Sequence, residues 1–405
     1  MLEHTLFMLS STFLNYIRKL YLKIDWDSKQ KDVTSQLNSL LLIKSYKKKQ
    51  TKVFIYLLIM DKKYTIKDIA KLAGVSKGTV DRVLHKRGKV SPAALEKVTE
   101  VLKVIDYEPN LIARNLKNNK IYRICILLPD PKMDPYWLPC LNGIDDAVKE
   151  FKAYNLVIET FYFNPEKKKS FLKTNAAVLE LSPDAVLLAP LFHKETVDVI
   201  EKYHSLNIIV NTFNNQVESS FVKSFVGQDL FRSGRVAAKL IDSITGNGQI
   251  AIVHIDETYK NAIHMQEKER GFRNYFDEKE NSAYTITTLK LKNPNVEISF
   301  NTFLNENPEV TGIFVTTSKA YQIAKIISDF KSKKIRVVGY DLIAENVAYL
   351  NQGVIDFMIH QNQKRQAYLG ITSLVEHFLF QKEIPEMIVL PIDIVNAENA
   401  EYYMV

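Results

Sequence analysis

Cysteine is scarce in this sequence: 405 residues contain two, Cys125 and Cys140. A disulfide-stabilised secreted scaffold needs more, so we expect reduced, packed thiols in a cytoplasmic protein. No spacing of Cys and His residues fits a metal site, and we expect neither a metal nor a cofactor.

Signatures of catalysis are also missing. No glycine-rich phosphate loop follows a strand, since the Gly246–Gly248 segment precedes one, as a turn would. No nucleophile elbow is present. His193, His254 and His360 are scattered over predicted strands and strand ends, where structural or ligand-contacting roles fit better than catalysis. We therefore do not expect an enzyme.

Targeting and membrane signals are absent from the first 59 residues. They lack glycine and proline, and no small-residue cleavage site follows an apolar core, which argues against a cleaved signal peptide. The apolar run Val53–Met60 is too short to cross a bilayer. We interpret residues 1–59 as a disordered extension or a mis-assigned translation start, and a membrane-surface anchor is the alternative.

The formal net charge of +8 is unevenly distributed. Residues 1–59 hold ten basic and four acidic residues, and residues 60–120 hold fourteen and seven. The rest of the chain is mildly acidic, with 30 basic and 35 acidic residues. This asymmetry fits a nucleic-acid-binding module attached to a body that avoids DNA.

Residues 64–117 show the pattern of three short helices and a fourth. Thr65, Ser76 and Ser91 are expected as N-caps, and Gly74 and Gly88 as helix ends. The predicted inward-facing residues are Ile66, Ile69, Ala70 and Ala73 in the first helix, Val80, Val83 and Leu84 in the second, and Leu95, Val98, Leu102 and Ile105 in the third.

A helix, a tight turn and a second helix form the helix-turn-helix plan. The outer face of the second helix carries Lys77, Thr79 and Arg82, and further basic residues follow between 86 and 89. These side chains are donors for phosphates and for guanine edges. An ordinary three-helix bundle with a solvated basic face fits the pattern as well.

The segments Thr65–Ser76, Thr79-Val80, Arg82–Leu84, Val90-Ser91 and Tyr107–Asn110 resemble the DNA-binding head of the lactose repressor (LacI/GalR) family, without a gap over about fifty residues. The resemblance implies that the second helix enters the major groove of a double-stranded DNA operator. The matching base-reading residues are Lys77, Gly78 and Arg82. The residues that match backbone contacts are Thr65, Ser76, Thr79, His85, Ser91 and Asn110.

The resemblance continues into residues 110–117, which are similar to the family's hinge helix. That helix folds on DNA and inserts a leucine into the minor groove, and Leu116 is the matching residue, with Arg114 beside it. Locally the segment is only a short, marginal helix, and a linker leucine packed against the next domain is the alternative. Two departures, Asp81 in place of the usual serine and the missing side chain at Gly78, leave the operator sequence open.

The resemblance also implies domain boundaries. The family head begins a few residues before its first helix, so Met60 is the expected start. We assign residues 60–107 to the DNA-binding domain, 108–120 to the hinge or linker, and 121–405 to a ligand-binding domain.

From Ile121 onward, apolar strand-like runs alternate with amphipathic helices. This alternation predicts an α/β body of two parallel sheets with helices on both faces, which follows the all-α head in the sequence. The expected strands are 123–128, 156–161, 184–189, 207–211, 249–255, 311–316, 335–340 and 356–360, and the clearest helices are 142–153, 230–243 and 320–330.

Ligands bind beyond the carboxyl ends of strands in such sheets. Aromatic residues beside Asn, Asp and Gln follow several predicted strands, and such a mixture suits a sugar. Residues 121–405 look like the periplasmic-binding-protein fold that serves these repressors as effector domain. The candidate ligand-binding residues are Asp134, Tyr136, Trp137, Phe192, Asn211, Lys268, Thr317, Asp341 and Gln361.

Some of these positions depart from the family pattern. Asp134–Trp137 is similar to the sugar-stacking segment of ribose-type binding proteins, but Lys268 stands where an arginine is usual, and Thr317-Ser318 replaces Asn-Asp. In the alternative to a pocket role, Tyr136 and Trp137 only pack the start of the helix that follows.

These features together predict a cytoplasmic, homodimeric transcription regulator of bacterial type, which binds an operator and a sugar-like effector without contacting a membrane. One alternative is a sugar-binding sensory module that does not bind an operator. A sugar-acting enzyme on a similar fold is the other.

Overall fold

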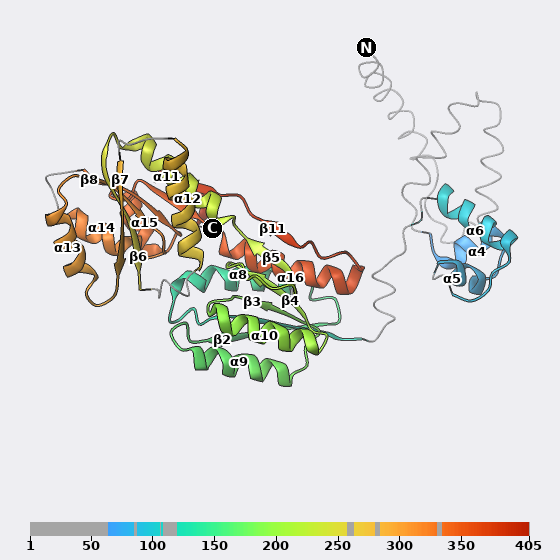
Figure 1. The fold of residues 1–405 in the computed structure, drawn as a ribbon. Helices are drawn as coiled ribbons and strands as arrows, with labels where there is room; N and C mark the ends of the chain where they lie inside the picture. Colours follow the sequence, from blue (N-terminus) through green and yellow to red (C-terminus); the bar gives the residue numbers. More distant parts are fainter. Residues whose placement is uncertain are drawn as a thin grey trace, which may run out of the picture. The chain divides into compact units, whose positions relative to one another are not determined.

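The computed structural model describes residues 64–84, 87–105, 107, 120–256, 263–279, 284–329 and 334–404. Contacts divide the chain into two units, Met1–Pro109 and Asn110–Val405, which we call the head and the body (Figure 1). Residues 1–59 and the predicted DNA contacts at His85, Asn110, Arg114 and Leu116 lie outside the described residues. In the described parts no helix is long and apolar enough to cross a membrane.

The head contains three helices, α4 (Ile66–Ala73), α5 (Lys77–Leu84) and α6 (Pro92–Val104). Their core contains the fully buried side chains of Ile69, Val80 and Val98, as predicted. Leu95, which we expected in this core, is 47% exposed. Leu95 lies in the first turn of α6, and the contacts of this helix with the core begin one turn later, at Val98.

The body contains two six-stranded sheets, each the centre of one lobe. The first sheet is parallel throughout, in the order β11-β5-β4-β3-β1-β2. Its strands are β1 (Tyr122–Pro129), β2 (Leu156–Phe163), β3 (Ala185–Leu188), β4 (Ile209–Phe213), β5 (Val222–Gly227) and β11 (Met387–Val389).

The second sheet has the order β12-β10-β9-β8-β6-β7, and β12 alone among these strands runs antiparallel to its neighbour. Its strands are β6 (Gly248–Ile255), β7 (Tyr284–Leu291), β8 (Val310–Val315), β9 (Arg336–Tyr340), β10 (Phe357–His360) and β12 (Asp393–Val395).

Helices cover both faces of each sheet (Figure 1). The first sheet lies between the pair α8 (Leu138–Glu150) and α16 (Gln363–Phe380) and the pair α9 (Lys168–Glu180) and α10 (His193–Ser205). The second lies between the pair α11 (Leu230–Ile244) and α12 (Ile263–Glu278) and the group α13 (Val296–Glu306), α14 (Ala320–Ser328) and α15 (Ala344–Asn351).

The side chains of β1 show why the strands are apolar throughout. Ile124 and Ile126 pack with α8 and α16, whereas Cys125 and Leu127 pack on the opposite face. A strand buried on both faces carries a continuous apolar run. Apolar runs predicted eight of the strands from the sequence, including β2, which lies at a sheet edge and is mostly half-buried. The predicted fold class is therefore confirmed.

Four strands were not predicted: β5, β7, β11 and β12. β7 lies at a sheet edge and is mostly half-buried, so threonine and lysine alternate with its apolar residues. β11 and β12 have three residues each, too few for a periodic pattern. In β5 a lysine and a serine interrupt the apolar run.

The chain crosses between the lobes three times, after β5, after β10 and between β11 and β12. Gln228, 2% exposed in the first crossing, holds the three together. Its Nε2 donates to the carbonyl of His360, the last residue of β10, at 2.9 Å and to that of Pro391, between β11 and β12, at 2.6 Å. The carboxyl ends of strands from both sheets lie beside these crossings.

Helices α11 and α12 pack through two glycines. A Cβ on Gly234 would lie 1.9 Å from the carbonyl oxygen of Lys268, and one on Gly271 would lie 1.9 Å from that of Phe231. Neither oxygen is part of a flexible side chain, so the helices can approach this closely only without side chains there.

We expect Gly271→Ala to lower the free energy of unfolding of the body by about 1–3 kcal/mol, because the helices must separate to admit the methyl group. Urea unfolding measures this change. Gly246→Ala is the matched control, because its Cβ meets nothing within 4 Å, and its stability should equal that of the wild type. Equal stability of both variants would contradict the close packing.

Candidate functional site

The outer surface of α5 gathers the residues predicted to contact DNA. Lys77, Gly78 and Arg82 are exposed, while Val80 on the opposite side of the helix is fully buried in the head's core. The helix is thus held by its inner face and presents the basic face outward, where it is available to a phosphate backbone or a base edge.

Four other predicted contact residues also stabilise the ends of the head's helices. Thr65 forms a capping box with Asp68: the Thr65 amide donates to the carboxylate at 2.9 Å, and the Asp68 amide donates to the Thr65 hydroxyl at 3.3 Å. Ser76 Oγ accepts from the amide of Thr79 at 3.1 Å, and Ser91 caps α6. These hydroxyls are positioned by the helices that they cap.

A second cluster of predicted residues centres on Asp341 at the end of β9. Asp341 is 2% exposed, and its carboxylate accepts from Gln361 Nε2 at 3.0 Å and from Gln363 Nε2 at 2.8 Å. Gln363 begins α16, a helix of the first lobe, so this contact joins the two lobes. Burial raises the pKa of Asp341 to about 6, although the charge of Lys268 and the two amide bonds act in the opposite direction.

Tyr136 extends the cluster within the first lobe. Its hydroxyl accepts a hydrogen bond from Asn214 Nδ2, and Gln366 Oε1 lies 3.5 Å from the same nitrogen. Burial and then the negative charge of Asp341 raise the pKa of the Tyr136 phenol. Asn214 and Asp341, each at a strand end, have left-handed φ angles of 72° and 70°. Asn and Asp tolerate this conformation best among residues other than glycine.

Lys268 of α12 is the cation of the cluster. It is 2% exposed, its Nζ donates to the Thr316 carbonyl at 3.0 Å, and the same atom lies 3.6 Å from the centre of the Tyr340 ring. Thr317, also predicted, is buried next to this carbonyl and accepts from the Lys319 amide at 3.5 Å.

Four predicted residues make their described contacts outside this hydrogen-bonded cluster. Asp134 caps the 3-10 helix η2 (Pro135–Trp137), and Trp137 is 3% exposed in the core beneath α8, edge-on to Tyr136. Phe192 packs on Phe171 at a ring distance of 5.6 Å. Asn211 donates to Ser373 of α16 at 3.1 Å, on the helix-covered face of the first sheet.

Sequence reasoning missed three amides of the cluster, Asn214, Gln363 and Gln366. Asn214 follows β4 directly, but this strand ends two residues later than predicted, so Asn211 lies inside it. Gln363 and Gln366 lie in the first turn of α16, and their inward direction depends on the packing of that helix. The local sequence around Gln363 and Gln366 does not indicate that their side chains point inward.

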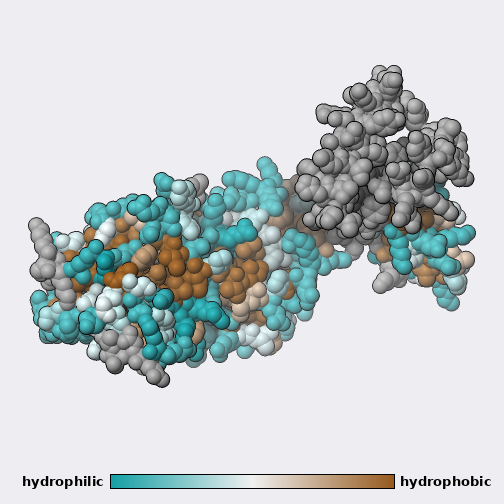
Figure 2. Space-filling view, turned by 90° about the horizontal axis from the view of Figure 1, so that it is seen from above, coloured by the Kyte–Doolittle hydropathy of each residue, from teal (hydrophilic) through white to brown (hydrophobic). Residues whose placement is uncertain are grey.

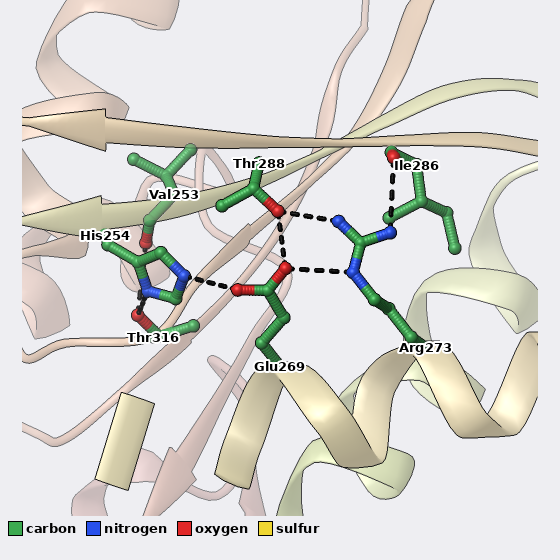
Figure 3. Close-up of polar contacts among 7 residues, drawn as sticks. All are labelled: Val253, His254, Glu269, Arg273, Ile286, Thr288 and Thr316. Atoms are coloured by element: carbon green, nitrogen blue, oxygen red, sulfur yellow. Dashed lines mark hydrogen bonds and ion pairs between the residues drawn. The ribbon is translucent and has the colours of Figure 1, made fainter. Parts of the chain in front are cut away.

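A network of polar and charged side chains surrounds Glu269 in the second lobe (Figure 3). Glu269 accepts from Arg273 Nε at 2.9 Å, and its other oxygen lies 2.8 Å from His254 Nε2. His254 Nδ1 lies 2.7 Å from the hydroxyl of Thr316, and Thr288 of β7 donates to Glu269. The network joins α12 to β6, β7 and β8, and it fixes Thr316, whose carbonyl holds Lys268.

The charge of Glu269 is well compensated. Burial alone would raise the pKa of this carboxylate, but its bonds to His254, Thr288 and Arg273 outweigh burial and lower the pKa to about 2. Glu269 therefore stays ionised near neutral pH, although its side chain is only 10% exposed.

Two protein families match the chain. Residues 124–382 match the periplasmic binding protein domain, and residues 65–110 match the bacterial regulatory proteins of the lacI family. The ribose operon repressor of Lactococcus lactis subsp. lactis is 29% identical over 226 residues, which are 53% of this chain and 63% of that protein. The sucrose operon repressor of Streptococcus mutans is 25% identical over 341 residues, covering 82% and 98%. The match therefore spans less than two thirds of the first relative and nearly all of the second.

Solved structures give the same picture of the body. The crystal structure of a protein assigned as a LacI transcriptional regulator from Bacteroides fragilis has a TM-score of 0.66 and 28% identity, covering 70% of this chain and 100% of that chain. A solute-binding protein from Burkholderia graminis, crystallised with D-arabinose, has a TM-score of 0.61 at 16% identity, covering 69% and 96%. The second likeness concerns the fold alone.

We expect Glu269→Gln to lower the free energy of unfolding by about 3 kcal/mol at pH 7, because the neutral amide cannot satisfy His254 and Arg273 together. The folded-state pKa of Glu269 is depressed from 4.5 to about 2, so the stabilisation is present above pH 4.5 and is lost as the pH falls toward 2.

Urea unfolding of both proteins at pH 7 and pH 3 measures this dependence. The difference between them should shrink at the lower pH. Glu278→Gln is the control, because that carboxylate is 58% exposed and pairs with Arg235 at the surface. A difference that does not depend on pH would contradict the depressed pKa.

Proposed function

Because the chain belongs to the periplasmic binding protein domain family and carries a lacI-family regulatory domain before it, we propose that it represses a sugar-related operon by binding a DNA operator. The carrying observation is the pairing of two sites in one chain. The head presents the basic face of α5, and the body brings Tyr136 and Asp341 from different lobes to one buried cluster.

In the head, α5 enters the major groove of the operator with its first turn foremost. Lys77 and Arg82 read base edges, and Arg87 and Lys89 add affinity for phosphates. The capped starts of α4, α5 and α6 supply the backbone contacts at Thr65, Ser76, Thr79 and Ser91. We assign His85, Asn110, Arg114 and Leu116 to the same interface through their match to the family.

In the body, a sugar-like effector binds at the cluster around Asp341. A carboxylate held by two amides can exchange those bonds for bonds to sugar hydroxyls, and Gln361 and Lys268 lie at the same place. Tyr136, with Trp137 edge-on to it, supplies the aromatic surface. Asp134, Phe192 and Thr317 follow β1, β3 and β8 at this edge and complete the proposed ligand set, whereas Asn211, which lies inside β4 and bonds to Ser373, is not part of it.

Effector binding is coupled to the operator through the position of the lobes. Sugar hydroxyl groups that replace the hydrogen bond between Asp341 and Gln363 change how closely the two lobes approach each other. The lobes rotate relative to each other about the three crossings beside Gln228. The regulator acts in the cytoplasm as a homodimer on a near-palindromic operator. Figure 2 shows hydrophobic areas on one face of the body. Met387 and Val389, on the edge strand β11, are exposed apolar side chains. Exposed apolar surface of this kind suits an interface between two copies of the chain.

Arg82→Ala should weaken binding to the operator by about 1–3 kcal/mol and relax its sequence preference, because one base-reading guanidinium is lost. The operator is the duplex that the wild-type protein selects from random-sequence DNA, and fluorescence anisotropy measures the affinity. Lys97→Ala, an exposed change on α6, is the control. An equal loss on a scrambled duplex would show that Arg82 contacts only the backbone, and failure of the wild type to select any duplex would refute the proposed function.

Tyr136→Phe should weaken the effect of the sugar on operator affinity about tenfold, because the ring stays in place while one polar contact is lost. The probe is whichever of D-ribose, D-arabinose, D-galactose and sucrose changes the wild-type affinity most. Tyr154→Phe, in the aromatic group beside Phe380, is the matched control. A normal response of Tyr136→Phe would exclude this hydroxyl from the effector site.

A further inference from the structure

His254 is a buried histidine with a hydrogen-bond partner at each ring nitrogen (Figure 3). It lies in β6 and is 2% exposed. Its Nε2 lies 2.8 Å from Glu269 Oε2, and its Nδ1 lies 2.7 Å from the hydroxyl of Thr316. In a neutral imidazole one nitrogen donates and the other accepts, so these two contacts decide which nitrogen carries the proton.

The carboxylate of Glu269 sets this tautomer. Glu269 is ionised near neutral pH and can only accept, so His254 Nε2 donates to it. The other carboxylate oxygen accepts from Arg273 Nε at 2.9 Å, and the guanidinium already balances the charge of Glu269. A second proton on the ring would leave a positive charge unbalanced among buried side chains, which costs free energy. The ring is therefore neutral, and its Nδ1 is an acceptor.

The hydroxyl of Thr316 donates to this acceptor. Thr316 follows β8 directly and is fully buried. The Val253 carbonyl also lies near the hydroxyl, at 3.3 Å, but it already accepts from the Thr316 amide at 3.1 Å. Thr316 is thus held at its amide by Val253 and at its side chain by His254. These two bonds fix the direction in which the Thr316 carbonyl points.

The carbonyl of Thr316 connects this arrangement to the proposed effector site. It accepts from Lys268 Nζ at 3.0 Å, and the same peptide group begins Thr317. A lysine ammonium is a compact charge at the end of a flexible side chain, so its position depends on the groups that hold it. The carbonyl and the ring of Tyr340, whose centre is 3.6 Å from Nζ, hold the ammonium where its charge acts on the Asp341 carboxylate.

We infer that His254 is a positioning residue of the effector site: through Thr316 it orients the peptide group that holds Lys268 and begins Thr317. This inference rests on the proposed binding of a sugar by the body. Glu269 contributes by selecting the tautomer whose Nδ1 accepts. If the network only joined α12 to the strands, every hydrogen bond removed from it would affect the sugar response alike. The two roles can therefore be separated by experiment.

The first experiment compares full-length Thr316→Val with Thr288→Val. Each change removes one hydroxyl of the network and keeps a branched side chain of similar shape. Thr288 donates to Glu269 and accepts from Arg273 Nη2 at 2.6 Å, so its loss weakens the network but leaves the bond between Thr316 and His254 in place. The probe is whichever of D-ribose, D-arabinose, D-galactose and sucrose changes the operator affinity of the wild type most. Fluorescence anisotropy gives the sugar concentration that produces half of this change.

For Thr316→Val we expect this half-effect concentration to rise about tenfold, because the charged hydrogen bond of Lys268 is misplaced. Thr288→Val should respond at the wild-type concentration, although urea should unfold both variants more easily than the wild type. The operator affinity without sugar should be unchanged in both, because the head is intact. An equal rise in the two variants would overturn the inference, and so would a wild-type response of Thr316→Val.

Two changes at His254 separate the roles of its ring nitrogens. Asparagine brings its amide to the place of Nδ1, where the oxygen accepts from Thr316, but it does not reach Glu269. Glutamine brings its amide to the place of Nε2, where the nitrogen donates to Glu269, but it leaves Thr316 without this acceptor. We expect His254→Asn to keep the wild-type half-effect concentration and to be the less stable of the two in urea. His254→Gln should be the more stable and should need about tenfold more sugar. Equal sugar responses, or the opposite ranking, would contradict the positioning role.

A measurement without sugar checks the tautomer. In the wild-type protein with isotope-labelled histidine, nitrogen NMR should show His254 protonated at Nε2 and unprotonated at Nδ1, with His254→Asn identifying the signals. A proton on Nδ1 would overturn the inference, because Thr316 could not then donate to it. If none of these sugars changes the operator affinity of the wild type, the proposed function fails and the inference fails with it. That outcome is distinct from the others, because it appears before any variant is compared.

Discussion

The three segments that connect the two lobes lie outside both sheets, so their backbone carbonyls need other hydrogen-bond donors. The buried side-chain amide of Gln228 supplies a donor to two of them. The Nε2 of Gln228 donates to the carbonyls of His360, where the second crossing begins at the end of β10, and of Pro391 in the third crossing. Buried carbonyls without donors cost free energy, so these two hydrogen bonds favour keeping the three segments together. The amide of Leu390 adds a bond to the carbonyl of Gly227 at 2.8 Å. The carboxyl ends of strands from both sheets remain beside this junction, where Asp341 meets Gln363.

The body contains two buried carboxylates whose pKa values are shifted in opposite directions. Glu269 has a histidine, an arginine and a threonine around it, and its pKa falls to about 2. Asp341 has two neutral amides and the more distant charge of Lys268, and its pKa rises to about 6. The carboxylate of Glu269 has hydrogen-bond partners at both oxygens, and through His254 it holds the side chain of Thr316 in place. The carboxylate of Asp341 has less compensation for its charge than its burial demands, and its pKa is therefore raised.

These two environments are linked through consecutive residues of α12. Successive helical residues point about 100° apart, so Glu269 faces β6 and β7 while Lys268 reaches toward Tyr340 and Asp341. The close crossing at Gly271 keeps α12, the helix that carries both side chains, against α11. A change in this crossing therefore affects the structural network and the proposed effector site together.

The sequence by itself determined the local features of this protein: the capped helices of the head with Thr65 and Gly74 at the ends of α4, the apolar strands of both sheets, and the strand-end position of Asp341. These follow from short-range rules, because capping, periodicity and burial on two faces act within a few residues. Tertiary structure alone decided which strand-end residues meet. Asn214 joins Tyr136 while Asn211 faces Ser373 of α16, and Gln363 and Gln366 enter the cluster through the docking of α16. The physical reason is that a strand's last residue and a helix's facing side depend on contacts between segments that lie 22 to 162 residues apart in the chain, which no local pattern records.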